Sequence, residues 1–349
     1  MTTSLPVRVL IVEDSAVVRQ LLTHIIAGDP RLQVVGAVSN AEEAISRLSE
    51  LKPDVISMDI RLPGIDGLEA TRQIMADHPT PIVVISGSVE PESLYSSMNA
   101  LRAGALSVVE KPVGGSNEHY AAIAQQIRTQ LYIMSQVAVV RRRMRPRPPA
   151  PTTAPRRPAI PPKIMVVASS TGGPQALAKV FAGLPADWPL PILLVQHMGA
   201  PFMPGFAAWL DSVVPQRVAL GKQDMKPLPG TITVAPGDRH LRIGRDGRLC
   251  TGDDPAIGGQ RPAANALFTS AADVFGGATI GVVLTGMGDD GAAGVRQLVH
   301  CGATVLAEHE NTAVVYGMPA AAARHGAMTL PLDLMAPHLI RLLNRNGES

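Results

Sequence analysis

Aromatic side chains, cysteines and long apolar runs are all scarce in this chain of 349 residues. With 3% Phe, Trp and Tyr, it lacks the aromatic surface on which single-stranded nucleic acids stack. Cys250 and Cys301 are too few for a disulfide framework or a zinc site built from cysteine. No apolar run reaches the ~18 residues of a membrane span. Acidic residues directly follow the first apolar run, which excludes a secretory signal and favours a cytoplasmic protein.

Positive charge is concentrated in residues 141–162, which read RRRMRPRPPAPTTAPRRPAIPP. Eight of these 22 residues are proline and seven are arginine. Proline is excluded from helix interiors and the arginines repel one another, so we expect an extended, solvated linker. A basic docking strip for an acidic partner is the alternative. Removing the seven charges from the net charge of +2 leaves −5, which disfavours nucleic-acid binding by the folded parts.

Before this linker, short apolar runs alternate with amphipathic stretches, which predicts a doubly wound parallel α/β sheet. The expected strands cover residues 7–12, 34–38, 54–58, 81–86 and 106–110. The expected helices cover about 15–27, 41–51, 92–103 and 117–140, with another that begins at Gly67. This arrangement assigns a first domain to residues 1–125, with its final helix running to about residue 140.

Polar residues stand at the carboxyl ends of these strands, where doubly wound sheets bind ligands. They are Glu13, Asp14, Asp59, Ser86 and Lys111. Three carboxylates at one edge repel each other unless a hard cation binds, and Mg²⁺ prefers such oxygen ligands. A carboxylate beside Mg²⁺ can attack a phosphoryl group, and a hydroxyl and a lysine can contact the added oxygens. A structural ion cluster without chemistry is the alternative.

The segments VEDSAVVR, SMDIRLPGIDGLEA, VVISGS and VEKP resemble the CheY-like receiver domain of response regulators, over about residues 6–125. The resemblance implies a flavodoxin-like fold and a Lys111–Pro112 bond in the cis form. The implied site comprises the phosphoacceptor Asp59, the Mg²⁺ ligands Glu13, Asp14, Asp59 and the backbone carbonyl of Arg61, and the switch residues Ser86 and Lys111. Val108 stands where the family often has Phe or Tyr, so the switch is expected to act through Ser86 and its loop.

After the linker, IMVVASSTGGPQALAKVFAGL (164–184) predicts a strand, a glycine-rich turn and a helix. Ser169 and Ser170 lie in the turn, where free N–H groups and the helix dipole favour an oxyanion. A second strand, PILLVQHM, reaches His197, and a third, in GVVLTGMGDDGAAG, runs into Asp289 and Asp290. Each residue alone fits a structural or capping role. Together, at converging strand ends, they indicate a nucleophile, a base and an orienting acid.

The segments ASSTGG, VQHM, VAPGDRHL, LFTSAA, VLTGMGDDGA and VVYGMP resemble the catalytic domain of the chemotaxis methylesterase family, CheB, over about residues 163–345. This implies a Rossmann-like α/β domain in residues 163–349. The implied site comprises the nucleophile Ser170, the base His197, the orienting acid Asp290, and the backbone N–H groups of Thr171 and Met287 as oxyanion donors. Ser169 stands where the family usually has Ala. His240 is expected to be structural or at the cleft rim, and His309 to lie in a loop.

The two resemblances imply a phosphorylation-activated protein-glutamate methylesterase that also deamidates receptor glutamines. The implied partners are the cytoplasmic domains of methyl-accepting chemoreceptors and a CheA-type histidine kinase, with recruitment to receptor arrays, no nucleic acid and no membrane insertion. Mg²⁺ is expected to serve the receiver, and the esterase reaction to need no cofactor. A catalytically idle adaptor and a transcription regulator are the alternatives. An intact Ser-His-Asp set argues against the first, and the missing helix-turn-helix pattern against the second.

Overall fold

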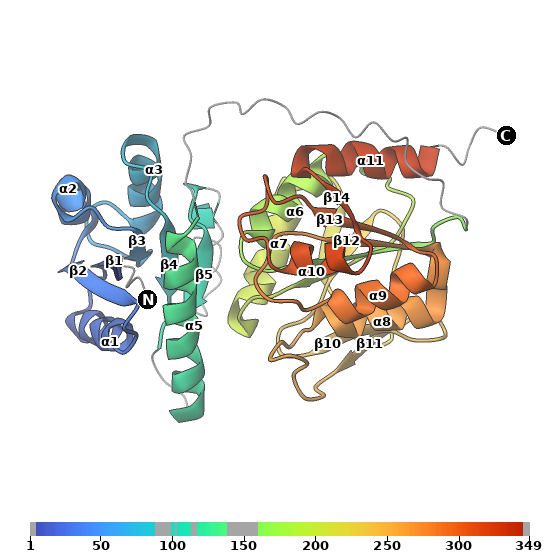
Figure 1. Cartoon of the computed structure of the whole chain (residues 1–349), viewed down its shortest axis with the longest axis horizontal. Coiled ribbons are helices and arrows are strands. Elements are labelled where there is room, and N and C mark those ends of the chain that lie inside the picture. The colour runs from blue at the N-terminus through green and yellow to red at the C-terminus, as the bar shows by residue number, and fades with distance from the viewer. Residues whose placement is uncertain (1–4, 88–98, 102, 113–116, 138–159, 345–349) are drawn as a thin grey trace. The chain divides into compact units, whose positions relative to one another are not determined.

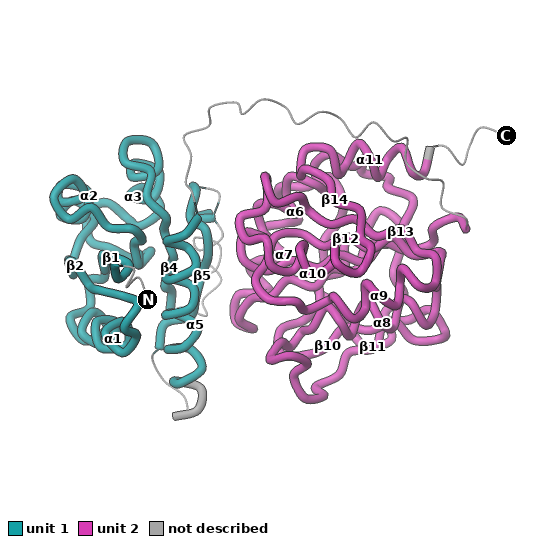
Figure 2. The backbone as a smooth tube through the Cα atoms, viewed as in Figure 1, with its two compact units in different colours: residues 1–145 teal, residues 146–349 magenta. Residues whose placement is uncertain are grey.

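The computed structural model of this protein describes residues 5–87, 99–101, 103–112, 117–137 and 160–344 (Figure 1). The chain forms two compact units, Met1–Arg145 and Pro146–Ser349 (Figure 2). Most of the expected helix over 92–103 and most of the expected linker over 141–162 lie outside the described residues. None of the described helices combines the length and the apolar character that a membrane span requires.

The first unit is built on a five-stranded parallel sheet in the order β2-β1-β3-β4-β5. Its strands are β1 (Val7–Val12), β2 (Leu32–Val38), β3 (Val55–Met58), β4 (Ile82–Ser86) and β5 (Ser107–Glu110). Its helices are α1 (Ala16–Ala27), α2 (Ala41–Leu51), α3 (Gly67–Asp77) and α5 (Asn117–Ser135). Helix α1 packs with α5, and α2 packs with α3, on the two sides of the sheet (Figure 1). The prediction of a flavodoxin-like, doubly wound sheet is confirmed.

Polar side chains set the ends of the helices in this unit. Ser15, Asn40 and Asp66 each accept a hydrogen bond from the N–H three residues further on, and so begin α1, α2 and α3.

The last helix of the first unit, α5, ends at Ser135, whereas the sequence predicted that it would run to about residue 140. The Ser135 hydroxyl donates to the Tyr132 carbonyl at 2.7 Å. The N–H groups of Gln136 and Val137 bond to carbonyls three residues back instead of four. The helix therefore tightens into a turn earlier than the apolar spacing suggested.

The second unit is built on a seven-stranded parallel sheet in the order β14-β13-β12-β6-β7-β9-β8. Its strands are β6 (Ile164–Ser169), β7 (Ile192–Gln196), β8 (Arg217–Leu220), β9 (Thr231–Val234), β12 (Thr279–Val283), β13 (Thr304–Glu308) and β14 (Met328–Leu330). An antiparallel pair, β10 (His240–Ile243) and β11 (Leu249–Gly252), is separate from this sheet. The helices are α6 (Gly173–Ala182), α7 (Met203–Val213), α8 (Ala264–Phe275), α9 (Ala292–His300), α10 (Met318–Arg324) and α11 (Leu332–Asn344).

The core of the second unit lies around the central strand β6. Ile164, Val166 and Ala168 of this strand pack in one buried cluster with Leu267 and Phe268 of α8. The strand is buried throughout, which explains why its residues 164–168 are all apolar. The prediction of a second doubly wound parallel sheet is confirmed.

Strand β6 lies between β12 and β7. The strands that follow β6 in the chain, from β7 to β9, lie on one side of it, and those from β12 to β14 lie on the other, so the strand order reverses at β6. Doubly wound sheets bind ligands at such a switch point, beyond the carboxyl ends of the strands. Backbone hydrogen bonds align the three ends: Leu284 donates to Ala168 at 2.9 Å, and His197 donates to Ser169 at 2.9 Å. The residues that follow β12, β6 and β7 therefore share one edge of the sheet.

Candidate active site

The two serines at the end of β6 lie in different environments: Ser169 is the last residue of the strand, and Ser170 is the first residue after it. Ser169 is fully buried, and its hydroxyl donates to Gln196 Oε1 at 2.6 Å. Ser170 is partly exposed, and its hydroxyl makes no hydrogen bond with any described residue. A buried hydroxyl held by a strong acceptor cannot attack a substrate, whereas the Ser170 hydroxyl is available to one.

A second glycine-rich loop, which follows β12, packs closely against Ser170. A Cβ added at Gly286 would lie 2.7 Å from Ser170 Cβ and 2.5 Å from Met318 Sδ. Such distances are shorter than van der Waals contact, so only glycine allows this approach. The Ser170 N–H donates to the Thr285 carbonyl at 3.0 Å, which ties the two loops together.

His197 and Asp290 form a hydrogen-bonded pair at the same edge. His197 Nε2 lies 2.8 Å from Asp290 Oδ2, and each side chain is 7% exposed. The other ring nitrogen, Nδ1, is buried and has no hydrogen-bond partner among the described residues. When Nε2 carries the proton that Asp290 accepts, Nδ1 keeps a lone pair and can act as a base.

Asp290 is also bound by the first residues of α8. Its Oδ2 accepts from Ala264 N–H at 2.6 Å, and its Oδ1 accepts from Asn265 N–H at 3.0 Å and Gly291 N–H at 2.9 Å. Burial opposes ionisation, but the hydrogen bond and charge of His197 and then these N–H groups outweigh it and lower the pKa of Asp290. Asp290 therefore caps α8, which lies earlier in the chain. Asp289 is exposed.

The two backbone groups expected to bind an oxyanion lie on the two loops. Thr171 is buried, and its carbonyl accepts from the Thr285 hydroxyl at 2.9 Å. Met287 lies between two glycines and is 47% exposed, and its N–H bonds to no described residue. Both N–H groups remain predicted oxyanion donors.

Three buried polar residues beneath this edge carried no predicted role: Gln196, Thr285 and Glu308. Glu308 Oε2 accepts from Thr285 N–H at 2.9 Å, and burial raises the pKa of Glu308. Each of the three stands at or just after the end of an apolar strand, and this position is the signal that could have found them.

Two further histidines of the matched region, His240 and His309, are not part of this hydrogen-bonded pair. His240 is fully buried, with Nε2 3.1 Å from the Pro255 carbonyl and Nδ1 accepting from Ala263 N–H at 3.2 Å. It is structural, as one of the two expectations held. His309 lies in the loop after β13, as expected.

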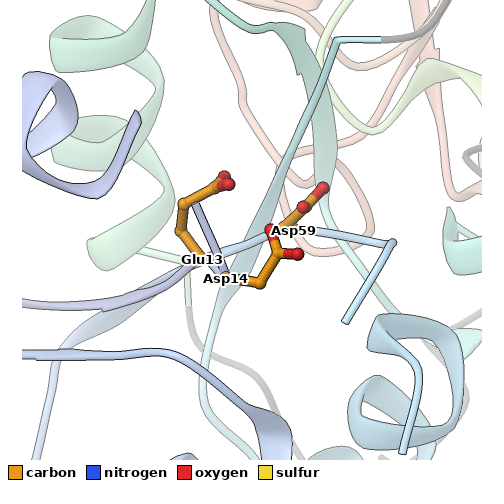
Figure 3. A group of neighbouring side chains, drawn as sticks. All are labelled: Glu13, Asp14 and Asp59. Atoms are coloured by element: carbon orange, nitrogen blue, oxygen red, sulfur yellow. The ribbon is translucent and has the colours of Figure 1, made fainter. Parts of the chain in front are cut away.

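In the first unit, the structure brings together the three acids predicted at the sheet edge. Carboxylate oxygens of Glu13, Asp14 and Asp59 lie within 4.8 Å of one another (Figure 3). Glu13 and Asp59 are buried and Asp14 is exposed. Lys111 Nζ lies 2.8 Å from Glu13 Oε2 and 2.9 Å from Asp59 Oδ2. Ser86, the last residue of β4, is buried, and its carbonyl accepts from Lys111 N–H at 3.0 Å.

The charges of this cluster perturb one another. Burial raises the pKa of Asp59 and of Glu13, although Lys111 acts in the opposite direction on both. Burial disfavours the charged form of Lys111, but Asp59 and Glu13 outweigh this effect and raise the pKa of the lysine. Three oxygen donors with excess negative charge and one exposed member suit a hard cation such as Mg²⁺. The Arg61 carbonyl remains a predicted ligand.

The prediction of a cis peptide bond between Lys111 and Pro112 is wrong. Among the described residues, the cis peptide bond is Arg261–Pro262. The trans form is intrinsically preferred before proline by about 0.5–1 kcal/mol, and Lys111 reaches both buried carboxylates in that form.

Comparisons with known proteins agree with both halves of the chain. The family model of the response regulator receiver domain matches residues 9–124, and that of the CheB methylesterase matches residues 165–339. A protein-glutamate methylesterase/protein-glutamine glutaminase of Paramagnetospirillum magneticum is 49% identical, over 98% of this chain and 99% of its own. A protein of the same name from Myxococcus xanthus is 43% identical, over 90% of each chain.

The second unit also matches a solved structure. The crystal structure of the Thermotoga maritima CheB methylesterase catalytic domain is 36% identical and covers 52% of this chain and 100% of its own, with a TM-score of 0.50. The two sheets thus define a response regulator whose second domain is an α/β enzyme. The chain belongs to the CheB methylesterase family, with its receiver domain preceding the esterase domain.

Proposed function

We propose that this chain is a protein-glutamate methylesterase and protein-glutamine glutaminase that acts on the cytoplasmic signalling domains of chemoreceptors. Relatives that match nearly the whole chain carry this double name. A γ-methyl ester and a γ-amide present the same carbonyl carbon, so one nucleophile can attack both, with methanol or ammonia as the leaving group. The observation that carries the proposal is the His197–Asp290 pair at the same sheet edge as the accessible Ser170 hydroxyl.

In the proposed reaction, Ser170 Oγ attacks the γ-carbonyl carbon while His197 takes the hydroxyl proton. Asp290 accepts from Nε2, so the nitrogen with the free lone pair is Nδ1, and Nδ1 is the proposed base. The N–H groups of Thr171 and Met287 hold the tetrahedral oxyanion. The proton on Nδ1 then passes to the leaving methanol or ammonia. Water then gives a proton to the same nitrogen and attacks the acyl carbon, and that proton passes to Ser170 Oγ as the bond to glutamate breaks.

Asp290 stabilises the imidazolium that forms during each half of this reaction. Its lowered pKa keeps it ionised at neutral pH, and the N–H groups of α8 fix its orientation. A charged, immobile acceptor on Nε2 maintains the tautomer in which Nδ1 is the base.

We also propose that a CheA-type histidine kinase phosphorylates Asp59 and that this activates the esterase. Glu13, Asp14, Asp59 and the Arg61 carbonyl would hold Mg²⁺, which supplies positive charge between the carboxylates and the incoming phosphoryl group. Lys111 already contacts Asp59 and can bind a phosphoryl oxygen with its ammonium group. Ser86, at the end of the neighbouring strand, is the proposed switch hydroxyl.

The unphosphorylated receiver is proposed to inhibit the esterase. This proposal is motivated by the sequence of segment 141–162, whose prolines and arginines are typical of a tether between domains. The protein would act in the cytoplasm, at receptor arrays, without binding nucleic acid.

Methanol release from methylated receptor membranes tests the proposed function. We expect release by the wild type, faster after phosphorylation of Asp59, and none above background with Ser170→Ala. Retained receptor binding without methanol release by the wild type would contradict the proposal and favour the adaptor alternative.

A further inference from the structure

The buried side chain of Gln196, the last residue of β7, connects the two residues proposed as nucleophile and base. Gln196 is 1% exposed. Its Nε2 donates to the Ser170 carbonyl at 2.8 Å and to the His197 carbonyl at 2.9 Å. Its Oε1 accepts from the Ser169 hydroxyl at 2.6 Å. One amide thus joins three residues of the two neighbouring strand ends.

The hydrogen-bonding groups define the orientation of this amide. Two carbonyl oxygens can only accept, so the NH₂ group must face Ser170 and His197. The opposite orientation would place Oε1 against both carbonyls, without a proton between them. The Ser169 hydroxyl supplies the donor that Oε1 needs on the other side. The amide therefore has one satisfied arrangement.

The start of α6 closes this amide off from solvent. The Ser170 carbonyl also accepts from Gly173 N–H at 2.8 Å. A Cβ added at Gly173 would overlap Gln196 Oε1 and would lie 2.8 Å from Ser169 Oγ. Glycine at this position lets the helix begin directly over the amide, and water has no room to replace its bonds.

We propose that Gln196, anchored by Ser169, is a positioning residue that sets the separation of Ser170 and His197. This inference rests on the proposed function and goes beyond it, because Gln196 touches neither the substrate nor the reacting atoms. It also assigns a role to Ser169, which stands where the family usually has Ala: the serine completes the bonding of Gln196. A displacement of about 1 Å between nucleophile and base can cost about 10²-fold in rate.

Gln216 provides a matched control within the same unit. It is also a buried glutamine, at 2% exposure, and its Nε2 donates to the carbonyls of Phe181, Leu184 and Pro185 at 3.3, 3.0 and 2.9 Å. It precedes β8, the edge strand of the sheet, and bonds to no residue of the candidate active site. Replacing either glutamine by leucine removes amide N–H bonds to backbone carbonyls at similar burial. Gln216 Oε1 has no hydrogen-bond partner among the described residues, so only the change at Gln196 also removes the acceptor of a second side chain, Ser169.

The test compares Gln196→Leu with Gln216→Leu in the full-length protein. Methanol release gives kcat and KM, and the rate at which a phosphonofluoridate labels Ser170 reports the nucleophile without any receptor. We expect Gln196→Leu to lower kcat and the labelling rate about 10²-fold, with KM within about twofold. Gln216→Leu should lower the melting temperature comparably and leave both rates near wild type. Ser169→Ala should lower both rates about three- to tenfold.

Equal effects of the two leucine variants on the rates, or an unchanged kcat in Gln196→Leu, would overturn the inference. If Gln196→Leu does not fold, the decision passes to Ser169→Ala, and an unchanged labelling rate there overturns it. A wild type that labels at Ser170 but releases no methanol contradicts the proposed function only. In that case the labelling rates of the variants still decide the role of Gln196. A wild type that does not label at all overturns both the inference and the proposed function.

Discussion

The receiver and the esterase domain both place reactive groups beyond the carboxyl ends of parallel strands, but they use opposite electrostatics. The receiver edge gathers three carboxylates around one lysine, Lys111. At the esterase edge, the carboxylate of Asp290 is surrounded by N–H donors. The first arrangement has more negative than positive charge and suits a hard cation, whereas in the second the carboxylate is compensated by N–H donors.

Two buried aspartates show the difference most clearly. Burial raises the pKa of Asp59, because Lys111 compensates only part of the cost. Asp290 is buried to a similar degree, yet its pKa is lowered by His197 and the backbone of α8. Burial alone therefore does not decide whether a carboxylate ionises, and the number and orientation of donors around it do.

The largest effect should come from removing the accessible serine. Ser170→Ala is expected to lower methanol release by about 10³-fold or more, because it removes the proposed nucleophile. Ser169→Ala should cost less than about tenfold, because its buried hydroxyl only completes the bonds of Gln196. His197→Ala should lower the rate of methanol release almost as much as Ser170→Ala does. Asp290→Asn should retain more activity than either variant.

Circular dichroism of each variant is the control for folding. The double variant Ser170→Ala/His197→Ala should be little worse than either single change, because the two act as a unit. A folded Ser170→Ala protein with wild-type turnover would refute the serine mechanism.

Removal of divalent cations should affect the receiver site and leave the esterase site unaffected. Chelation is expected to abolish labelling of Asp59 by a small acyl phosphate, as Asp59→Asn should, and to leave the basal hydrolysis rate unchanged. The reason is that, among the described residues, the cluster of carboxylates suited to a metal ion lies at the receiver edge. Parallel assays of phosphate incorporation and methanol release measure both. Wild-type labelling of Asp59→Asn, or a basal esterase that stops on chelation, would contradict the comparison.

Deleting the receiver should raise the basal rate several-fold. A fragment that begins near Lys163 retains the whole seven-stranded sheet and its own core, so it should fold alone. We expect it to release methanol faster than the unphosphorylated full-length protein, and at about the rate of the phosphorylated one. Equal rates for fragment and unphosphorylated protein would remove inhibition as the role of the receiver.

The stability of that fragment should depend on pH through Asp290. A lowered pKa in the folded state contributes stability above the ordinary pKa of 3.8, and this contribution is lost as pH falls through the folded value. The melting temperature of the wild-type fragment should therefore exceed that of Asp290→Asn at pH 7, and the gap should shrink on acidification below about pH 4. Thermal unfolding followed by circular dichroism measures the gap. A gap that stays constant down to pH 2 would rule out this linkage.

The smallest effect is expected at Glu308, whose contribution to stability should change with pH in the direction opposite to that of Asp290. Glu308 is buried with a raised pKa, so its protonated form favours folding below the ordinary pKa of 4.5 and that contribution is lost as pH rises. Glu308→Gln keeps the shape and an acceptor for Thr285 N–H without the charge. We expect the variant to match wild type near pH 4 and to melt a few degrees higher at pH 8. If Glu308→Gln raises the melting temperature most at acidic pH, the raised pKa of Glu308 is contradicted.

The sequence alone determined the two sheets and the residue types at their edges. Strand, turn and helix follow one another locally, and apolar runs bounded by glycine or acids mark each strand end. Asp59, Ser170, His197 and Asp290 could therefore be named from position and family resemblance. The end of α5 could not, because it depends on a hydroxyl that bonds to its own helix.

Only the tertiary structure decided which side chains meet. Ser169 bonds to Gln196, which lies 27 positions away in the chain. Asp290 caps α8 through Ala264, which lies 26 positions away. These contacts depend on the parallel register of β6 with β7 and β12, which no local pattern specifies. The sequence placed two serines in one turn, and the pairing of strands decided which of them faces outward.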